Sequence, residues 1–139
     1  MVRRVVLCSG KVFFDLLAAR REGDIADIAI VRVEQLYPFP RQCLRELLNQ
    51  YVNAREIVWC QEEPRNQGAW YQIQHHLRAL KDAGQSLGYA GRPPSASPAC
   101  GYPRLHQLQQ QALVDTALSG SPVDDPGERL DDIDTHFSG

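Results

Sequence analysis

The chain has 139 residues, of which 43% are hydrophobic and 23% are charged, and its net charge is −2. This length suits one domain with a buried core, and the near-neutral charge disfavours nucleic acid or an anionic membrane as a partner. No apolar run approaches the roughly 20 residues of a membrane span, and no signal-peptide pattern opens the chain. A strand-like run follows the first residues almost directly, so we expect that more protein precedes this segment.

Short apolar runs alternate with amphipathic segments along the chain. Strands are predicted at 5–8, 28–33, 57–60 and 87–90, and helices at about 11–21, 40–51, 68–84 and 103–118. The Pro-rich segment 91–98 is predicted to be an irregular loop, because its prolines exclude a helix or a central strand. Helical crossovers between strands predict a largely parallel sheet with helices on both faces. We therefore expect an α/β domain over 1–118. The Gly-, Pro- and acid-rich residues 119–139 read as a flexible tail.

Four cysteines lie far apart, without a zinc-like spacing. Cys8 and Cys60 fall inside predicted strands, where a thiol usually packs as a small hydrophobic group. Unpaired thiols of this kind fit a cytoplasmic protein. His75 and His76 are neighbours on a predicted helix, so their side chains diverge and make a poor metal pair. We predict no metal site in this chain.

Polar residues follow the predicted strands, where parallel strands end together and where ligands usually bind such sheets. The segment Ser9-Gly10-Lys11 could bind an anion through free backbone N–H groups and an ammonium, or Ser9 could simply cap the following helix. It is not a phosphate-binding P-loop, because Val12 follows the lysine. Basic residues at the other loops, Arg32 and Arg41 among them, make a weak case for an anionic effector.

The segment after the third predicted strand combines two carboxylates with amides and an arginine. Glu62 and Glu63 are adjacent, so on a strand their side chains point to opposite faces and cannot converge on one substrate. We therefore predict no catalytic residue here. One carboxylate is expected to accept hydrogen bonds from the next helix or an arginine, and the other to face solvent or another domain.

Several longer segments, in order, carry a family resemblance. The chain resembles the C-terminal domain of the thiamin-dependent, decarboxylating first component of the 2-oxoglutarate dehydrogenase complex. The matching segments are CSGKVFFDL (8–16), IVRVEQLYPFP (30–40), VWCQEEP with NQGAW (58–64 and 66–70) and YAGRP with SASPA (89–93 and 95–99). The thiamin-diphosphate motif of the family, a Gly-Asp-Gly run with paired Asn, has no counterpart in this sequence.

The resemblance implies a transketolase-type C-terminal domain, with a three-layer, mostly parallel or mixed five-stranded sheet whose fifth strand follows Ala90 or lies near Ala99. It implies a parent oxidoreductase of the citric acid cycle that decarboxylates 2-oxoglutarate and transfers succinyl to lipoamide, using thiamin diphosphate and magnesium bound by other domains. It also implies partners: the upstream domains, a second copy in a homodimer, and the succinyltransferase component.

Alone, the chain is expected to bind no cofactor and to serve dimer packing, closure of the cofactor cleft and response to an effector such as acetyl-CoA. The alternative is a freestanding α/β module that binds an anionic nucleotide or acyl-CoA. Candidate effector residues are Lys11, Arg32 and Arg41. Candidate domain-interface residues are Gln61, Glu62, Glu63, Arg65, Asn66, Gln67 and Arg92.

Overall fold

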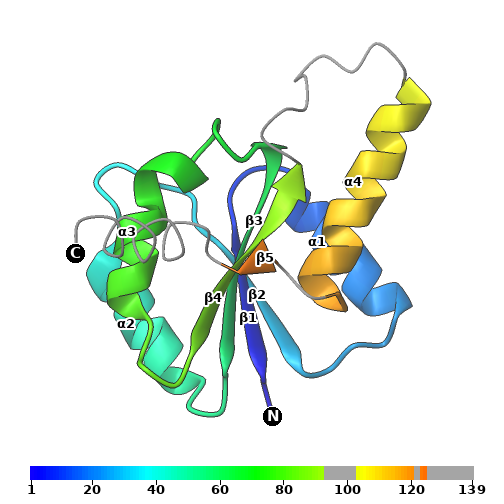
Figure 1. Cartoon of the computed structure of the whole chain (residues 1–139). Coiled ribbons are helices and arrows are strands. Elements are labelled where there is room, and N and C mark those ends of the chain that lie inside the picture. Colours follow the sequence, from blue (N-terminus) through cyan, green and yellow to red (C-terminus); the bar gives the residue numbers. More distant parts are fainter. Residues whose placement is uncertain (93–102, 121–122, 125–139) are drawn as a thin grey trace, which may run out of the picture.

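A computed structural model describes residues 1–92, 103–120 and 123–124 of the chain, which form a three-layer α/β fold (Figure 1). A central sheet separates α2 and α3 on one side from α1 and α4 on the other, as predicted. The elements in chain order are β1 (Arg4–Cys8), α1 (Val12–Glu22), β2 (Ile28–Arg32), α2 (Arg41–Gln50), β3 (Glu56–Pro64), α3 (Trp70–Leu80), β4 (Ser86–Arg92), α4 (Pro103–Leu118) and β5 (Val123–Asp124).

The five strands lie in the order β2-β1-β3-β4-β5. The first four are parallel, and β5 pairs antiparallel with β4, so the prediction of a mostly parallel or mixed sheet is confirmed. The chain leaves β1 toward β2 on one side and then returns past β1 to β3. The order therefore reverses between β1 and β3, and ligands of open α/β sheets usually bind at such a reversal.

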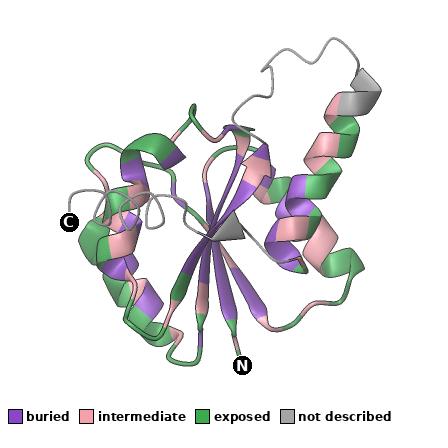
Figure 2. Ribbon diagram, in the orientation of Figure 1, coloured by how far each residue is buried: buried purple, intermediate pink, exposed green. Residues whose placement is uncertain are grey.

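The strands β1 to β4 bury side chains on both faces, which explains their largely apolar sequences. In β1, Val5 and Leu7 pack toward α2 and α3, whereas Val6 and Cys8 pack toward α1 and α4. Figure 2 shows the resulting band of buried residues along the middle of the sheet. Cys8 and Cys60 are fully buried in this band, so the interpretation of these thiols as core residues is confirmed.

Two of the strands extend further than the sequence predicted. β3 continues through Gln61 to Pro64, with a register irregularity after Cys60, and β4 includes Gly91 and Arg92. The prediction that Gly91 and Arg92 lie in an irregular segment is therefore wrong. A Cβ at Gly91 would lie 2.4 Å from the Tyr89 hydroxyl and 2.9 Å from the Gln61 carbonyl oxygen, so only glycine allows these strands to continue in contact.

The fifth strand lies at Val123–Asp124, within the predicted tail, rather than after Ala90. Residues 93–102, 121–122 and 125–139 lie outside the described part of the chain. The expected loop 93–98, the second suggested place for the fifth strand near residue 99, and most of the predicted tail fall there. The division of the chain into 1–118 and 119–139 stays a prediction.

The amino end of the sheet, where β1, β2 and β3 begin, is held by ion pairs. Arg3 contacts Asp27 at 2.6 Å and Glu56 at 3.1 Å. Arg4 is 4% exposed and contacts the other oxygen of Glu56 at 2.9 Å. Arg4 also donates to the carbonyls of Ala117 and Gly120 at the end of α4, where a cation is favoured. These charges are paired within the chain and fasten α4 to the sheet, although Arg4 Nε has no hydrogen-bond partner among the described residues.

Candidate functional site

Most of the predicted site residues lie at the carboxyl end of the sheet, which here means residues 9–11, 34–37, 61–69 and 92. The segment 61–69 contributes the end of β3 and the connection to α3. The structure divides the predicted interface residues into two kinds. Some are buried inside the chain and build the site, and others are exposed and can meet a partner.

Gln61 belongs to the first kind, since it is only 2% exposed. Its side-chain oxygen accepts from the Trp59 indole and from the backbone N–H of Trp70, each at 2.9 Å. Its side-chain nitrogen donates to the carbonyls of Glu63, Pro64 and Gln67 at 2.8 to 3.1 Å. The carboxamide therefore joins the end of β3 to the start of α3, and no hydrogen-bonding capacity is left for a ligand.

Arg92 is also buried, at 7% exposure. Its guanidinium donates to the Glu62 carbonyl, and a terminal nitrogen lies 3.1 Å from the Gln110 side-chain oxygen and 3.2 Å from His106 Nε2. Its Nε has no hydrogen-bond partner. In this arrangement the charge of Arg92 is held by neutral acceptors only, and His106 must keep a lone pair on Nε2 to accept the bond.

Glu62 and Glu63 have different surroundings, as their adjacency predicted. Glu62 accepts from the Gln110 side chain at 2.8 Å, and the same nitrogen of Gln110 donates to Asp15 at 2.8 Å. Gln110 thus joins β3, α1 and α4. Glu63 is exposed, and its carboxylate has no hydrogen-bond or ion-pair partner in the described part of the chain. Both residues nevertheless line one small cavity of about 170 Å³, so the absence of a catalytic pair stays a prediction.

The remaining interface candidates surround this pair. The Arg65 guanidinium lies 4.9 Å from the centre of the Tyr89 ring, and its Nε is buried without a partner. Asn66 and Gln67 are exposed in the connection to α3. These three residues are therefore placed on the outer side of the same segment, beside Glu63.

The structure does not bring the three effector candidates together. Lys11 is exposed at the start of α1, Arg32 packs 5.3 Å from the centre of the Phe14 ring, and Arg41 lies 2.6 Å from His76 Nδ1. Lys11 is the N-cap of α1, without a side-chain capping bond, so the expectation of a Ser9 cap is wrong. The pKa of His76 is lowered by loss of solvation, and by nearby His75 and Arg41, which favours the neutral acceptor that Arg41 requires.

Three cavities open around these residues. One of about 480 Å³ lies between the ends of β1 and β3, at the reversal of strand order. A second of about 170 Å³ is lined by Lys11, Glu62, Glu63 and Arg92, with His106 beside them. Neither is lined by Arg32 or Arg41.

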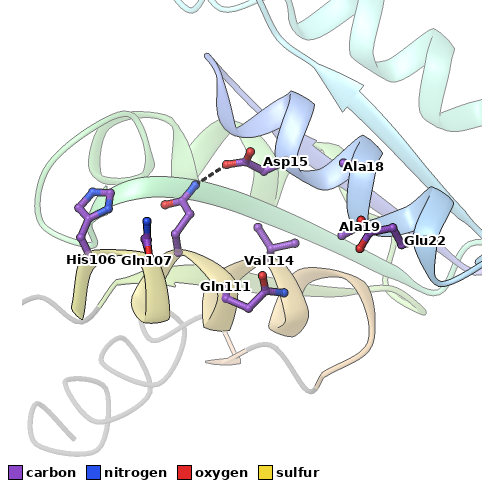
Figure 3. Close-up of a pocket in the computed structure, with 9 residues that line it drawn as sticks. Asp15, Ala18, Ala19, Glu22, His106, Gln107, Gln111 and Val114 are labelled. Atoms are coloured by element: carbon purple, nitrogen blue, oxygen red, sulfur yellow. Dashed lines mark hydrogen bonds between the residues drawn. The ribbon is translucent and has the colours of Figure 1, made fainter. Parts of the chain in front are cut away.

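The third cavity, of about 360 Å³, lies between α1 and α4 (Figure 3). Ala18, Ala19 and Val114 supply its apolar surface. Asp15 projects across it from α1 toward the Gln110 amide, and their hydrogen bond crosses the gap between the helices. Its polar lining is used largely to join the two helices.

Burial keeps the thiols of Cys8 and Cys60 and the hydroxyl of Tyr89 protonated. It raises the pKa of the Cys8 thiol to about 12, although Arg32 acts in the opposite direction, and it raises that of Cys60 further. It also raises the pKa of the Tyr89 hydroxyl to about 12. All three groups are protonated at neutral pH, so none supplies a thiolate or phenolate for chemistry.

Sequence reasoning missed several residues that build this end of the sheet. Neither Gln110 nor His106 was among the predicted site residues. Tyr37 donates to the Gln72 side chain from the loop after β2. Local spacing could not reveal these contacts, because they join residues between 14 and 95 positions apart in the sequence.

Comparison with known proteins gives the family. The family model described as "2-oxoglutarate dehydrogenase C-terminal" matches residues 1–118. The chain belongs to this family. It is 54% identical over 121 residues to the 2-oxoglutarate dehydrogenase E1 component of Azotobacter vinelandii, covering 85% of the chain and 13% of that protein. It is 53% identical over 118 residues to the E1 components of Cupriavidus necator and Haemophilus influenzae, covering 85% of the chain and 12% and 13% of those proteins.

The chain therefore spans about an eighth of the length of these relatives. The resemblance stated from the sequence is confirmed, and it extends over most of the described structure. The comparisons support the reading of the chain as a C-terminal segment of a 2-oxoglutarate dehydrogenase E1 component, and not the alternative of a freestanding nucleotide-binding module.

Proposed function

We propose that this chain acts as the C-terminal domain of a 2-oxoglutarate dehydrogenase, where it packs against the rest of the enzyme through the carboxyl end of its sheet. The observation that carries the proposal is the family match over residues 1–118, joined to relatives of about eight times the matched length. A segment of this size that belongs to a longer enzyme needs a surface for the remaining polypeptide.

The distribution of polar groups supports the carboxyl end of the sheet as that surface. Glu63, Lys11, Asn66 and Gln67 are exposed there, while Gln61 and Arg92 hold the backbone beneath them. A rigid backbone beneath exposed side chains lowers the ordering cost of binding, because only the side chains must become fixed. We call the buried Gln61 and Arg92 the scaffold of this surface. We call the exposed side chains above them its contact rim, which comprises Lys11, Glu63, Asn66 and Gln67.

The residues present do not fit the cofactor of the parent reaction. In the part of the chain that the structure describes, no three His, Cys, Asp or Glu side chains are grouped to hold a metal ion. Glu62 is engaged by Gln110, and Lys11 is the single exposed cation at the cavity it shares with Glu62 and Glu63. We therefore propose that thiamin diphosphate and magnesium are bound by other domains, and derive no reaction step from these residues.

The wider assignments follow from the same proposal. The parent enzyme would decarboxylate 2-oxoglutarate and pass a succinyl group to lipoamide on the succinyltransferase component, as a cytoplasmic homodimer. In the described ranges, no helix is long and apolar enough to cross a membrane. An effector response through Lys11, Arg32 and Arg41 would require three separate contacts with the partner or ligand, since these residues line no common cavity.

A domain exchange tests the proposal. The segment of the A. vinelandii enzyme that aligns with this chain is replaced by residues 1–118, and 2-oxoglutarate-dependent reduction of an artificial electron acceptor is measured. We expect the chimera to retain most of the activity, and the same enzyme with the segment deleted to lose it. A chimera that folds and dimerises but is as inactive as the deletion would contradict the proposal.

A further inference from the structure

The cavity between β1 and β3 is lined by more aromatic surface than the cavity between α1 and α4. It occupies about 480 Å³ at the carboxyl end of the sheet, between the two strands at which the topology reverses. Its walls include the apolar and aromatic surfaces of Leu36, Tyr37 and Trp59. Tyr37 is 61% exposed, so its ring stands at the open side of the cavity.

The polar groups of the lining are mostly engaged already. The Trp59 indole N–H and the backbone N–H of Trp70 both donate to Gln61, whose amide nitrogen is used by three carbonyls. The Tyr37 hydroxyl donates to the Gln72 side-chain oxygen. The lining keeps other donors, such as the Ser9 hydroxyl, so the argument against an anionic ligand rests on the charge of Glu63.

Among the described residues, Glu63 is the one charged side chain that lines this cavity, with no Lys, Arg or His beside it in the lining. The carboxylate has no hydrogen-bond or ion-pair partner in the described ranges. It lies near the start of α3, whose dipole supplies about half of a positive charge. That fraction cannot neutralise a full carboxylate, so the cavity carries a net negative charge beside aromatic surface.

The backbone of Gly68 lies against the side chain of Glu63. Its φ of +66° suits glycine, and a Cβ there would lie 3.0 Å from the Glu63 Cβ and 3.2 Å from its Cγ and Cδ. The side chain of Glu63 therefore lies directly across the glycine backbone. A carboxylate that is positioned before binding loses less conformational entropy when a partner arrives.

We propose that this cavity binds an arginine side chain from the remainder of the enzyme, with Glu63 as the ion-pair partner and Tyr37 as the aromatic wall. The inference rests on the proposed function, since about seven eighths of the length of the relatives lies outside this chain and must meet it. A guanidinium matches a carboxylate with two parallel hydrogen bonds and packs against an aromatic face, whereas an ammonium offers neither planar feature.

Direct titration of the 139-residue chain tests the cavity without the rest of the enzyme. Nα-acetyl-arginine amide is added up to about 50 mM, a range that detects even weak binding, and amide and indole NMR signals are followed. We expect saturable shifts of the Trp59 indole and of Gly10 and Gly68, which line or underlie the cavity. The uncharged analogue Nα-acetyl-citrulline amide should bind at least about tenfold more weakly, because it cannot form the charged hydrogen bonds with a carboxylate.

Two variants locate the binding. Glu63→Gln should weaken arginine-amide binding at least about fivefold, whereas Glu34→Gln, which removes an exposed carboxylate from the loop after β2, should leave it unchanged. Absence of saturable shifts, equal binding of the citrulline analogue, or equal binding to Glu63→Gln overturns the inference. Each of these results is independent of the domain exchange: an active chimera with no arginine binding would retain the proposed function and remove only this site.

Discussion

The two ends of the sheet handle charge in opposite ways. At the amino end, Arg3 and Arg4 form ion pairs with Asp27 and Glu56, and Arg4 also binds the end of α4. At the carboxyl end, Glu63 and Lys11 are exposed without ion-pair partners in the described residues, and Arg92 is held by neutral acceptors. The charges at the amino end are thus paired within the chain, whereas the carboxyl end keeps charges available for a partner.

This difference also separates stability from function. An ion pair that is closed within the chain contributes to folding and offers little to another surface. A rigid loop with unpaired charges contributes little to folding and can form new pairs on binding. Substitutions at the two ends should therefore have different consequences, and the scaffold beneath the carboxyl end should behave like the core rather than like its exposed rim.

The largest effect on stability is expected at Gln61. Replacement by leucine leaves the Trp59 indole and the Trp70 N–H buried without their acceptor, and should lower the free energy of unfolding by about 3 kcal/mol. Urea denaturation followed by tryptophan fluorescence measures the change. Gln67→Leu is the matched control, because its side chain is exposed, and it should change stability by less than about 0.5 kcal/mol. Similar losses in both variants would contradict the role of Gln61.

The next effect is expected at the amino end. Glu56→Ala removes the carboxylate that pairs with the buried Arg4 and should cost about 2 kcal/mol, less than for a fully buried pair because Glu56 is 32% exposed. Asp27→Asn weakens the more exposed pair with Arg3, for which we expect a clearly smaller loss of stability because solvent screens that pair. If the two variants were equally stable, the argument from the burial of Arg4 would be wrong.

Glu63→Gln should change stability by less than about 0.5 kcal/mol, since the carboxylate is exposed and unpaired in this chain. In the chimera described above, the same change should weaken the contact between this domain and the rest of the enzyme, and so lower the temperature at which the chimera unfolds. Thermal unfolding of the isolated chain and of the chimera, measured side by side, checks both parts. A large loss in the isolated chain would show that Glu63 supports the fold and would move it from the rim to the scaffold.

The smallest effect concerns pH. A hydrogen bond from Arg3 lowers the pKa of Asp27 below its usual 3.8. The folded state then favours the ionised form, so this contribution is complete above the unfolded pKa and is lost as the pH falls through the folded one. Urea midpoints of the wild type and of Asp27→Asn should therefore converge only as the pH falls through the lowered pKa of folded Asp27, which lies below 3.8. A difference that persists unchanged at lower pH would count against the Arg3 contact.

The sequence predicted the main elements because their signals are local. Leu44 and Leu48 mark one face of α2, and the apolar runs of β1 and β2 indicate strands that are buried on both sides. The ends of β3 and β4 were underestimated. Gln61 is polar and Gly91 disfavours strands, yet the first is satisfied internally and the second makes room for Tyr89.

The candidate site was predictable in position but not in detail. Parallel strands bring Lys11 and Glu63 to the same end of the sheet, and chain order alone implies this. The partners of Arg92 and Glu62 come from α4, and Gln110 reaches both. Such contacts depend on how a helix crosses the sheet, which the helical period of a Gln-rich segment does not specify. The distinction between scaffold and rim therefore required the structure.

The most direct test of the central claim is amide hydrogen exchange, measured for the chain alone and for the same chain within the A. vinelandii chimera. If the carboxyl end of the sheet meets the rest of the enzyme, the amides of Gly10, Lys11 and 65–69 should exchange more slowly in the chimera, while those of 23–27 and 52–55 at the amino end should be unchanged. Slower exchange at the amino end, with none at the carboxyl end, would contradict the account.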